Sequence, residues 1–165
     1  MSANAQTRNT YQLFSGKVFR VPDYQRNYSW DEDNWEDLWN DIKEGLATKT
    51  EHYWGTITLR DTGLPALYCD EKDTPFSIYE VVDGQQRITS LYLFLLAMCR
   101  VGRPAIEENF IKTGRIYRLE LGGLNNQFLK ELVDEGDPQP AVKTNRLIRD
   151  ALDYFLGDTV VRQGR

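Results

Sequence analysis

The feature that most constrains this chain is a β-rich run that passes, through a single glycine, into its most apolar helical segment. Residues Phe76–Val82 combine aromatic and β-branched side chains, which is typical of a strand. Residues Gln85–Val101 place apolar side chains at helical spacing, and a glycine and a proline follow them. Asp83 and Gly84 stand between the two. The pattern therefore predicts a strand that turns sharply into a helix, and hence a domain with both a sheet and helices.

The rest of the chain alternates between the same two patterns. Further strands are predicted at Lys17–Val21, Tyr53–Arg60 and Arg115–Leu121, a turn at 61–65, helices at 31–46, 124–133 and 142–156, and a linker at 136–140. This order predicts a mixed α/β (α+β) domain over 11–135. We expect residues 1–10 to be a flexible lead-in. Residues 141–165 should begin a helical region of a longer protein, because an amphipathic helix must bury its apolar face; a disordered tail is the alternative.

Composition excludes several classes of protein. The chain has 165 residues, with 20 Lys and Arg against 25 Asp and Glu, so its net charge of −5 disfavours a sequence-independent grip on a phosphate backbone. A single histidine, His52, and two cysteines, Cys69 and Cys99, exclude a self-contained zinc finger or an HNH nuclease centre. One disulfide or a buried free thiol at Cys99 are both open. No signal peptide or membrane span is predicted, so we expect a cytoplasmic protein.

Five consecutive residues at the strand–helix junction form the first candidate site. A helix start offers unpaired backbone N–H groups and a positive dipole end, and Gly84 lets the backbone approach a ligand closely. Arg87 carries a guanidinium that matches phosphate oxygens. Asp83 can hold a Mg²⁺-bound water or take a proton from an attacking water, and Gln85 or Gln86 can orient that water. These residue types together favour binding and hydrolysis of a phosphate compound.

A purely structural role for the same junction is the alternative. Asp83 can serve as the N-cap of the helix, and Arg87 can pair with Asp83 across the first turn. The sequence has neither the Gly-x-x-x-x-Gly-Lys pattern of a P-loop nor the Gly-x-Gly-x-x-Gly pattern of a dinucleotide site. Neither of those two motifs therefore supports a phosphate site at this junction.

The loop Pro22–Trp30 is the second candidate site. Gln25 and Arg26 can reach a phosphate or a base edge, and the loop's aromatic residues can stack on a base. Those aromatic residues are Tyr24, Tyr28 and Trp30. The alternative is an aromatic loop that anchors the strand to the helix, and for Trp30 we favour that core role.

Three motifs in this order resemble a known family. They are Val-Pro-Asp-Tyr-Gln-Arg-Asn-Tyr-Ser-Trp at 21–30, Tyr-Trp-Gly-Thr-Ile-Thr-Leu at 53–59 and Val-Val-Asp-Gly-Gln-Gln-Arg-Ile-Thr-Ser-Leu at 81–91. In this order they closely resemble the N-terminal domain of GmrSD-type (type IV, modification-dependent) restriction enzymes. The resemblance runs from Val18 to Leu96 and continues weakly over Thr144–Phe155, where Asn145, Arg146 and Tyr154 fit.

The resemblance implies a ParB/sulfiredoxin-like fold with a small mixed sheet, flanking helices and a helical C-terminal part. It also implies binding and hydrolysis of a nucleoside triphosphate with Mg²⁺, in a regulatory domain of a restriction or phage-defence protein. Asp83 and Gln86 would be catalytic, and Asp83 would hold the metal. The nucleotide would be bound by Tyr24, Gln25, Arg26, Gly84, Gln85, Arg87 and Thr89.

Family members usually carry a C-terminal nuclease domain of HNH type, which the single histidine excludes here. We therefore expect contact with DNA through the full-length protein or a partner nuclease, no cleavage of DNA by this chain alone, and a homo-oligomer as an open option. A sensor that binds nucleotide or modified DNA without hydrolysis is the runner-up. A ParB-like DNA-binding domain is a third possibility, which the net charge disfavours.

Overall fold

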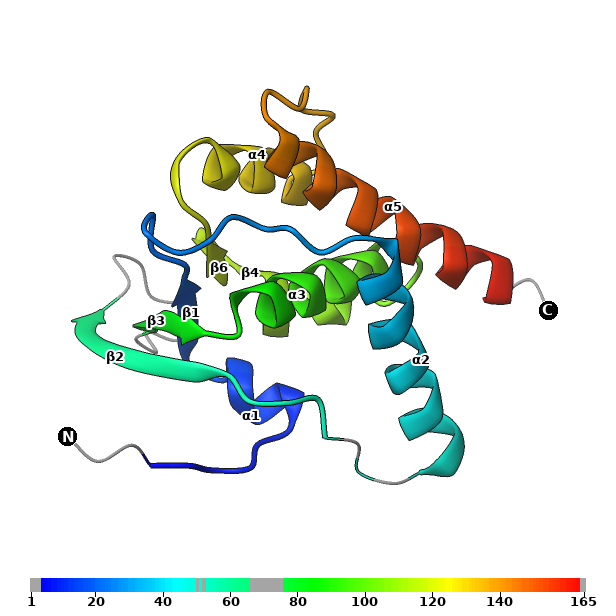
Figure 1. Cartoon of the computed structure of the whole chain (residues 1–165), viewed down its shortest axis with the longest axis horizontal. Helices are drawn as coiled ribbons and strands as arrows, with labels where there is room; N and C mark the ends of the chain where they lie inside the picture. The colour runs from blue at the N-terminus through cyan, green and yellow to red at the C-terminus, as the bar shows by residue number, and fades with distance from the viewer. Residues whose placement is uncertain (1–3, 50, 52, 66–75, 164–165) are drawn as a thin grey trace.

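A computed structural model describes residues 4–49, 51, 53–65 and 76–163, so His52 and Cys69 lie outside the described residues. The chain is a mixed α/β domain, which confirms the predicted fold class. Figure 1 shows the sheet beside the central helix α3 (Gln85–Arg100), with the other long helices around that helix. The likeness to ParB and sulfiredoxin stays a prediction.

The main sheet has four strands in the order β2-β3-β1-β6. The strands are β1 (Lys17–Arg20), β2 (Thr58–Pro65), β3 (Ser77–Asp83) and β6 (Leu119–Glu120). The first strand, β1, is parallel to both β3 and β6, and β2 is antiparallel to β3. Two short strands, β4 (Lys112–Thr113) and β5 (Ile116–Tyr117), pair with each other in a separate antiparallel sheet.

Two strand predictions were wrong in their bounds. The turn predicted at 61–65 belongs to β2, because the pairing with β3 changes register between Asp61 and Pro65 and so accommodates residues that usually make turns. The strand predicted at Arg115–Leu121 is split at Arg118, whose guanidinium is buried. It donates to the backbone carbonyls of Phe14, Lys17 and Asn109. Since Arg118 turns inward to reach these acceptors, the strand breaks into β5 and β6.

Alternate side chains of the sheet supply two hydrophobic clusters. Phe19 and Val81 belong to the main core with the helices, whereas Val18 and Ile78 belong to a small cluster with Phe76 and Ile116. Neighbours along a strand point to opposite faces, so both faces of the sheet are covered. The main core, which includes Phe19 and Val81, lies between the sheet and the long helices.

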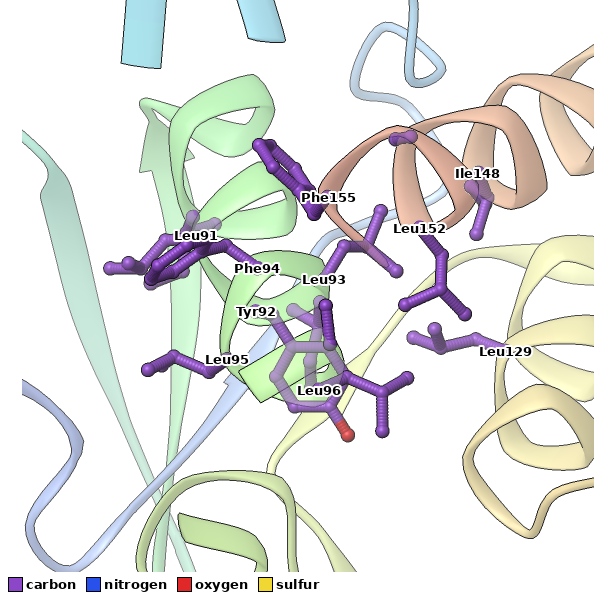
Figure 2. Close-up of a cluster of buried hydrophobic side chains, with 14 of the residues drawn as sticks. Leu91, Tyr92, Leu93, Phe94, Leu95, Leu96, Leu129, Ile148, Leu152 and Phe155 are labelled. Carbon is purple, nitrogen blue, oxygen red and sulfur yellow. The ribbon is translucent and has the colours of Figure 1, made fainter. Parts of the chain in front are cut away.

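The helix α3 is buried on nearly all sides. Leu91, Leu93 and Phe94 lie on different sides of it and all are buried. The helix α5 (Lys143–Gln163) packs along α3, and Trp39 of α2 (Glu32–Thr48) contacts the ring of Phe94. Figure 2 shows this cluster of α3 with Leu129, Ile148, Leu152 and Phe155, which come from α4 (Gly123–Val133) and α5. Cys99, near its end, is a half-buried free thiol.

Three other helical features differ from prediction. A short helix α1 (Thr10–Phe14) begins within the predicted lead-in, where Asn9 and Gln12 form a capping box. A π-helix η1 (Glu107–Ile111) follows α3 and was not predicted. The helix α2 continues to Thr48, past the predicted end at residue 46, and Leu46 in its last turn is exposed. Asp31, at which the helix was predicted to begin, is the N-cap of α2.

The last helix, α5, shares one core with the rest of the chain. Its buried residues Ile148, Ala151, Leu152 and Phe155 pack in the same cluster as α3 and α4. The division into 11–135 and 141–165 stays a prediction, but the described part of 141–165 does not stand apart from the core. None of the described helices combines the length and apolarity needed to cross a membrane.

Candidate functional site

The junction between β3 and α3 is built around Gly84. It has a φ of 90°, and a Cβ there would lie 3.1 Å from the Ile57 side chain and 3.2 Å from the Thr56 carbonyl oxygen. A glycine is therefore needed for both its conformation and its close packing. Gly84 is itself the N-cap and α3 has no side-chain cap, so the alternative role of Asp83 as N-cap is wrong. Asp83 is the exposed last residue of β3.

Gln86 connects α3 to the aromatic loop. Its side chain is buried, and its Oε1 accepts hydrogen bonds from the backbone N–H groups of Ser29 at 2.7 Å and Trp30 at 3.2 Å. Its Nε2 donates to the carbonyl of Asn27 at 3.0 Å. The Gln86 amide thus supplies the hydrogen-bond partners for three backbone groups of the loop. That Gln86 orients a water stays a prediction; the structure gives its amide this holding role.

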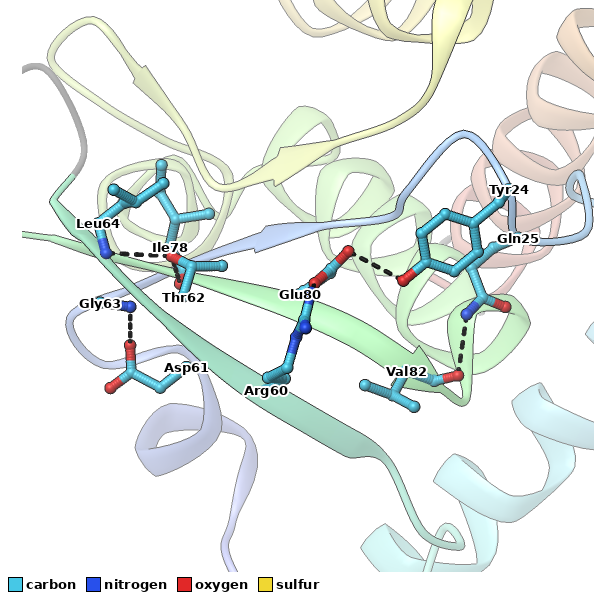
Figure 3. A network of polar contacts seen from close by, with 10 residues as sticks. All are labelled: Tyr24, Gln25, Arg60, Asp61, Thr62, Gly63, Leu64, Ile78, Glu80 and Val82. Carbon is cyan, nitrogen blue, oxygen red and sulfur yellow. Dashed lines mark hydrogen bonds and ion pairs between the residues drawn. The ribbon is translucent and has the colours of Figure 1, made fainter. Parts of the chain in front are cut away.

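The start of the same loop is attached to β3. Gln25 donates from Nε2 to the Val82 carbonyl at 3.1 Å, and the Tyr24 hydroxyl donates to Glu80 Oε1 at 3.0 Å (Figure 3). Glu80 is buried and also pairs with Arg60 of β2. These contacts hold the loop before Arg26 and those of Gln86 hold it after Arg26, whose side chain is exposed.

Tyr28 is a buried ring that also lines the cavity described below. It is buried, and its hydroxyl lies 2.6 Å from Ser90 Oγ and accepts from Trp35 Nε1 at 2.9 Å. Burial raises the pKa of Tyr28 to about 12, although its two hydrogen bonds act in the opposite direction. The loop folds this ring inward, with its hydroxyl held by Ser90 and Trp35, and the stacking role of Tyr28 stays a prediction. Trp30 is half-buried against the core, in line with the core role favoured for it.

A cavity of about 380 Å³ lies between this loop and the starts of three helices. Five of the predicted site residues line it: Gln25, Arg26, Gln85, Gln86 and Thr89. Tyr24, Asp83, Gly84 and Arg87 do not line it. The volume falls in the range of small-ligand pockets, which usually hold about 300–1,000 Å³.

The three helix starts come from distant parts of the chain. The cavity is lined by Gln85 and Gln86 from the first turn of α3, by Gly122–Asn125 at the start of α4, and by Val142 and Thr144 at the start of α5. Each first turn leaves backbone N–H groups without helical partners and adds a positive dipole end. Their convergence makes the cavity favourable for negative charge.

Arg87 lies on the other side of the first turn of α3. Its Nη1 donates to the Thr56 carbonyl at 3.2 Å, and a Cβ on Gly55 would lie 2.6 Å from the guanidinium carbon. The motif at 53–59 therefore packs directly against the motif at 81–91, with two glycines at the contact. No hydrogen bond or ion pair joins Arg87 to Asp83 in the described structure, so that alternative pairing is also wrong. Phosphate binding by Arg87 stays a prediction.

Asp23, Asn125 and Thr144 are polar residues of the cavity lining that were not predicted from the sequence. Together with the predicted Arg26, Asp23 supplies the charged side chains among the described residues that line the cavity. The Asp23 carboxylate lies against the Cα of Gly122, where a larger residue would collide with it, and it accepts no hydrogen bond from the described residues. Asn125 and Thr144 also line the cavity, from α4 and α5. Their chain positions, about 100 residues after the loop, carry no local signal of this proximity.

These features define a mixed α/β domain in which the starts of three helices and one aromatic loop surround a cavity. Residues 10–155 match the family described as GmrSD restriction endonuclease, N-terminal domain. The chain belongs to this family, which indicates a component of a restriction or phage-defence system. No curated protein matches the chain.

Proposed function

We propose that this chain is a regulatory domain that binds and hydrolyses a nucleoside triphosphate within a modification-dependent restriction system. The observation that carries the proposal is the cavity, where three helix starts converge beside Arg26. Such an arrangement favours several negative charges in one place, which a triphosphate has. The family membership supports a role in restriction but does not identify the ligand.

The phosphates would be held at the floor of the cavity. Arg26 supplies a guanidinium, and the first turn of α3 supplies backbone N–H groups at Gln85 and Gln86. Thr89 is buried in the wall and offers a hydroxyl. Leu124 and Val142 are exposed apolar residues in the cavity lining, which suits the less polar part of a nucleotide.

The carboxylate for Mg²⁺ or for the attacking water is better supplied by Asp23 than by Asp83. Asp23 lines the cavity and has no described partner, whereas Asp83 is exposed at the end of β3. The described residues hold no cluster of three potential metal ligands, so a magnesium ion would depend on one carboxylate, waters and the phosphates, as it commonly does. When bound, Mg²⁺ neutralises phosphate charge. Asp83 stays a candidate for the same roles.

Hydrolysis would join the oxygen of a water to the terminal phosphorus and break that phosphorus's bond to the bridging oxygen, which leaves on the nucleoside diphosphate. The water's proton would pass to the carboxylate. Gln86 would act mainly as a positioning residue, because its amide already holds the loop that carries Arg26. Catalysis of this kind depends chiefly on positioning and electrostatics.

A sensor that binds without hydrolysis is the second candidate. Two observations favour it. The Gln86 amide is already hydrogen-bonded to the loop, and Asp83 lies away from the cavity, so Asp23 is the only carboxylate among the described lining residues. In either case the net charge of −5 leads us to expect that DNA is contacted and cut through another domain or a partner of HNH type, not by this chain alone.

The test is a thermal-shift panel of nucleoside triphosphates with and without Mg²⁺, followed by phosphate-release assays. Binding to the folded state raises the apparent stability. We expect stabilisation by at least one triphosphate, which Asp23→Asn leaves in place while phosphate release is lost. Asp83→Asn should keep both. Release that persists in Asp23→Asn and stops in Asp83→Asn would return the catalytic role to Asp83, and binding without release by the parent would support the sensor.

A further inference from the structure

Two asparagines outside the predicted site connect the starts of α4 and α5. Asn125 is in the first turn of α4 and lines the cavity. Asn145 is in the first turn of α5 and is 2% exposed. A hydrogen bond of 2.8 Å joins the two side chains. A buried amide of this kind must have its hydrogen-bonding groups satisfied, so its orientation is determined by its neighbours.

The orientation of both amides follows from one backbone group. The N–H of Ala141 can only donate, and it donates to Asn145 Oδ1 at 3.2 Å. The Nδ2 of Asn145 is then the donor to its other partner, which is Asn125 Oδ1. With its oxygen occupied in this way, Asn125 is left with its Nδ2 group to offer. The cavity therefore receives a hydrogen-bond donor from Asn125 rather than an acceptor.

We infer that Asn125 is a ligand-binding residue whose Nδ2 donates to an anionic oxygen in the cavity, and that Asn145 is the positioning residue that sets this polarity. The inference rests on the proposed function, because it takes the ligand to be a polyphosphate. It adds an uncharged donor on α4 to the guanidinium of Arg26 and the N–H groups of α3. Phosphate oxygens would thus be contacted from two sides of the cavity.

The decisive variant is Asn125→Asp in the full chain. One carboxylate oxygen still accepts from Asn145, so the fold is kept, but the other replaces a donor with a negative acceptor facing the phosphates. We expect the affinity for inorganic triphosphate and for ATP with Mg²⁺, measured by calorimetry, to fall by about 100-fold or more.

Asn126→Asp is the matched control. Asn126 is the next residue of α4, its Oδ1 accepts from the Leu121 N–H at 3.2 Å, and it does not line this cavity. The substitution introduces the same charge at the same helix end while leaving an acceptor for Leu121. We expect its affinity to stay within about threefold of the parent, since the new charge on this half-buried residue lies outside the cavity lining.

Two further readouts separate ligand contact from a structural role. Asn145→Asp keeps the bond from Ala141 but presents an acceptor to Asn125, which must then turn its Nδ2 away from the cavity; we expect an affinity loss of about tenfold or more with native circular dichroism. If that variant unfolds, the pH dependence of Asn125→Asp decides. Protonation of its carboxyl towards pH 5 restores a donor, so the affinity ratio of parent to variant should fall.

The outcomes distinguish this inference from the proposed function. If the parent binds triphosphate and Asn125→Asp binds equally well at neutral pH, Asn125 is not a ligand-binding residue and the proposed function stands. If neither the parent nor Asn126→Asp binds any triphosphate or inorganic polyphosphate, the proposed function fails and the inference fails with it. An affinity ratio that does not change with pH would also overturn the donor role.

Discussion

The two sides of the first turn of α3 differ in what they contact, although their residues are adjacent in sequence. Gln86 points towards the aromatic loop and the cavity, where its amide holds three backbone groups. Arg87 points towards the segment before β2, where its guanidinium lies over Gly55 and bonds to Thr56. Consecutive helical residues are about 100° apart, so Gln86 and Arg87 contact different segments of the chain. A five-residue motif is therefore divided between a cavity-facing part and a packing part.

The largest effect is expected from Gln86→Leu. Leucine keeps the buried volume but leaves the N–H groups of Ser29 and Trp30 without their acceptor, which should lower the free energy of unfolding by about 3 kcal/mol. Urea unfolding followed by tryptophan fluorescence measures the change. Gln85→Leu is the control, since no hydrogen bond of the described structure uses its amide. Equal losses for the two variants would mean that Gln86 does not hold the loop.

The two arginines should differ in ligand binding. Arg26→Ala removes the positive side chain that lines the cavity, so we expect the affinity for triphosphate to fall by about 10- to 100-fold. Arg87→Ala should lower it by less than about threefold, while reducing stability by about 1 kcal/mol through loss of the bond to Thr56. Titration calorimetry compares them. A larger loss of affinity in Arg87→Ala would place its guanidinium at the phosphates instead.

The packing side is tested by Gly55→Ala. At a φ of 101° the new methyl group is strained and would lie 2.6 Å from the guanidinium carbon of Arg87. We expect a loss of about 2 kcal/mol in unfolding free energy, against about 1 kcal/mol for Gly63→Ala, where φ is also positive but nothing lies within 4 Å.

A double-mutant cycle separates the collision of the new methyl group with Arg87 from the backbone strain at Gly55. With Arg87→Ala in the background, Gly55→Ala should cost no more than Gly63→Ala, because the guanidinium is gone. An unchanged cost in that background would show that Arg87 does not determine the need for glycine at this position.

The smallest effect is expected in the pH dependence of stability, through Tyr28 of the aromatic loop. The pKa of Tyr28 is about 12 in the folded chain because the ring is buried, against about 10 in an unfolded chain. Between these values the unfolded state binds fewer protons, so stability is complete below about pH 10 and is lost as the pH rises. We expect Tyr28 to account for about 1 kcal/mol of the loss near pH 11. The unfolding midpoint of Tyr28→Phe should fall less steeply over this range, and an identical pH profile would contradict the assignment.

Local patterns predicted most of the secondary structure and part of the site. The capped start of α2, the helix after Gly84 and the buried stripe of α5 each follow from spacing and capping residues within one segment. For the same reason five residues predicted for the site line the cavity, because they lie in two short motifs: Gln25, Arg26, Gln85, Gln86 and Thr89.

What could not be predicted depends on contacts between distant segments. The break at Arg118 follows from carbonyl acceptors on Phe14, Lys17 and Asn109, of which two lie about 100 residues earlier. Asn125 reaches the cavity only because α4 packs beside α5, and the orientation of its amide depends on the backbone N–H of Ala141, just before α5. Spacing along one helix carries no information about such neighbours.

The position of β1 in the sheet has a consequence for how the chain folds. This strand is made first, yet it lies between partners that come much later: Phe19 aligns with Tyr79 of β3 and with Leu119 of β6. At about 5–20 residues per second, a ribosome needs several seconds to add the last of these partners. Until β3 has been added the apolar side chains of β1 have no sheet to join, and the edge of β1 that pairs with β6 stays open for longer. Long-range pairing of this kind slows folding and leaves a sticky edge exposed during synthesis.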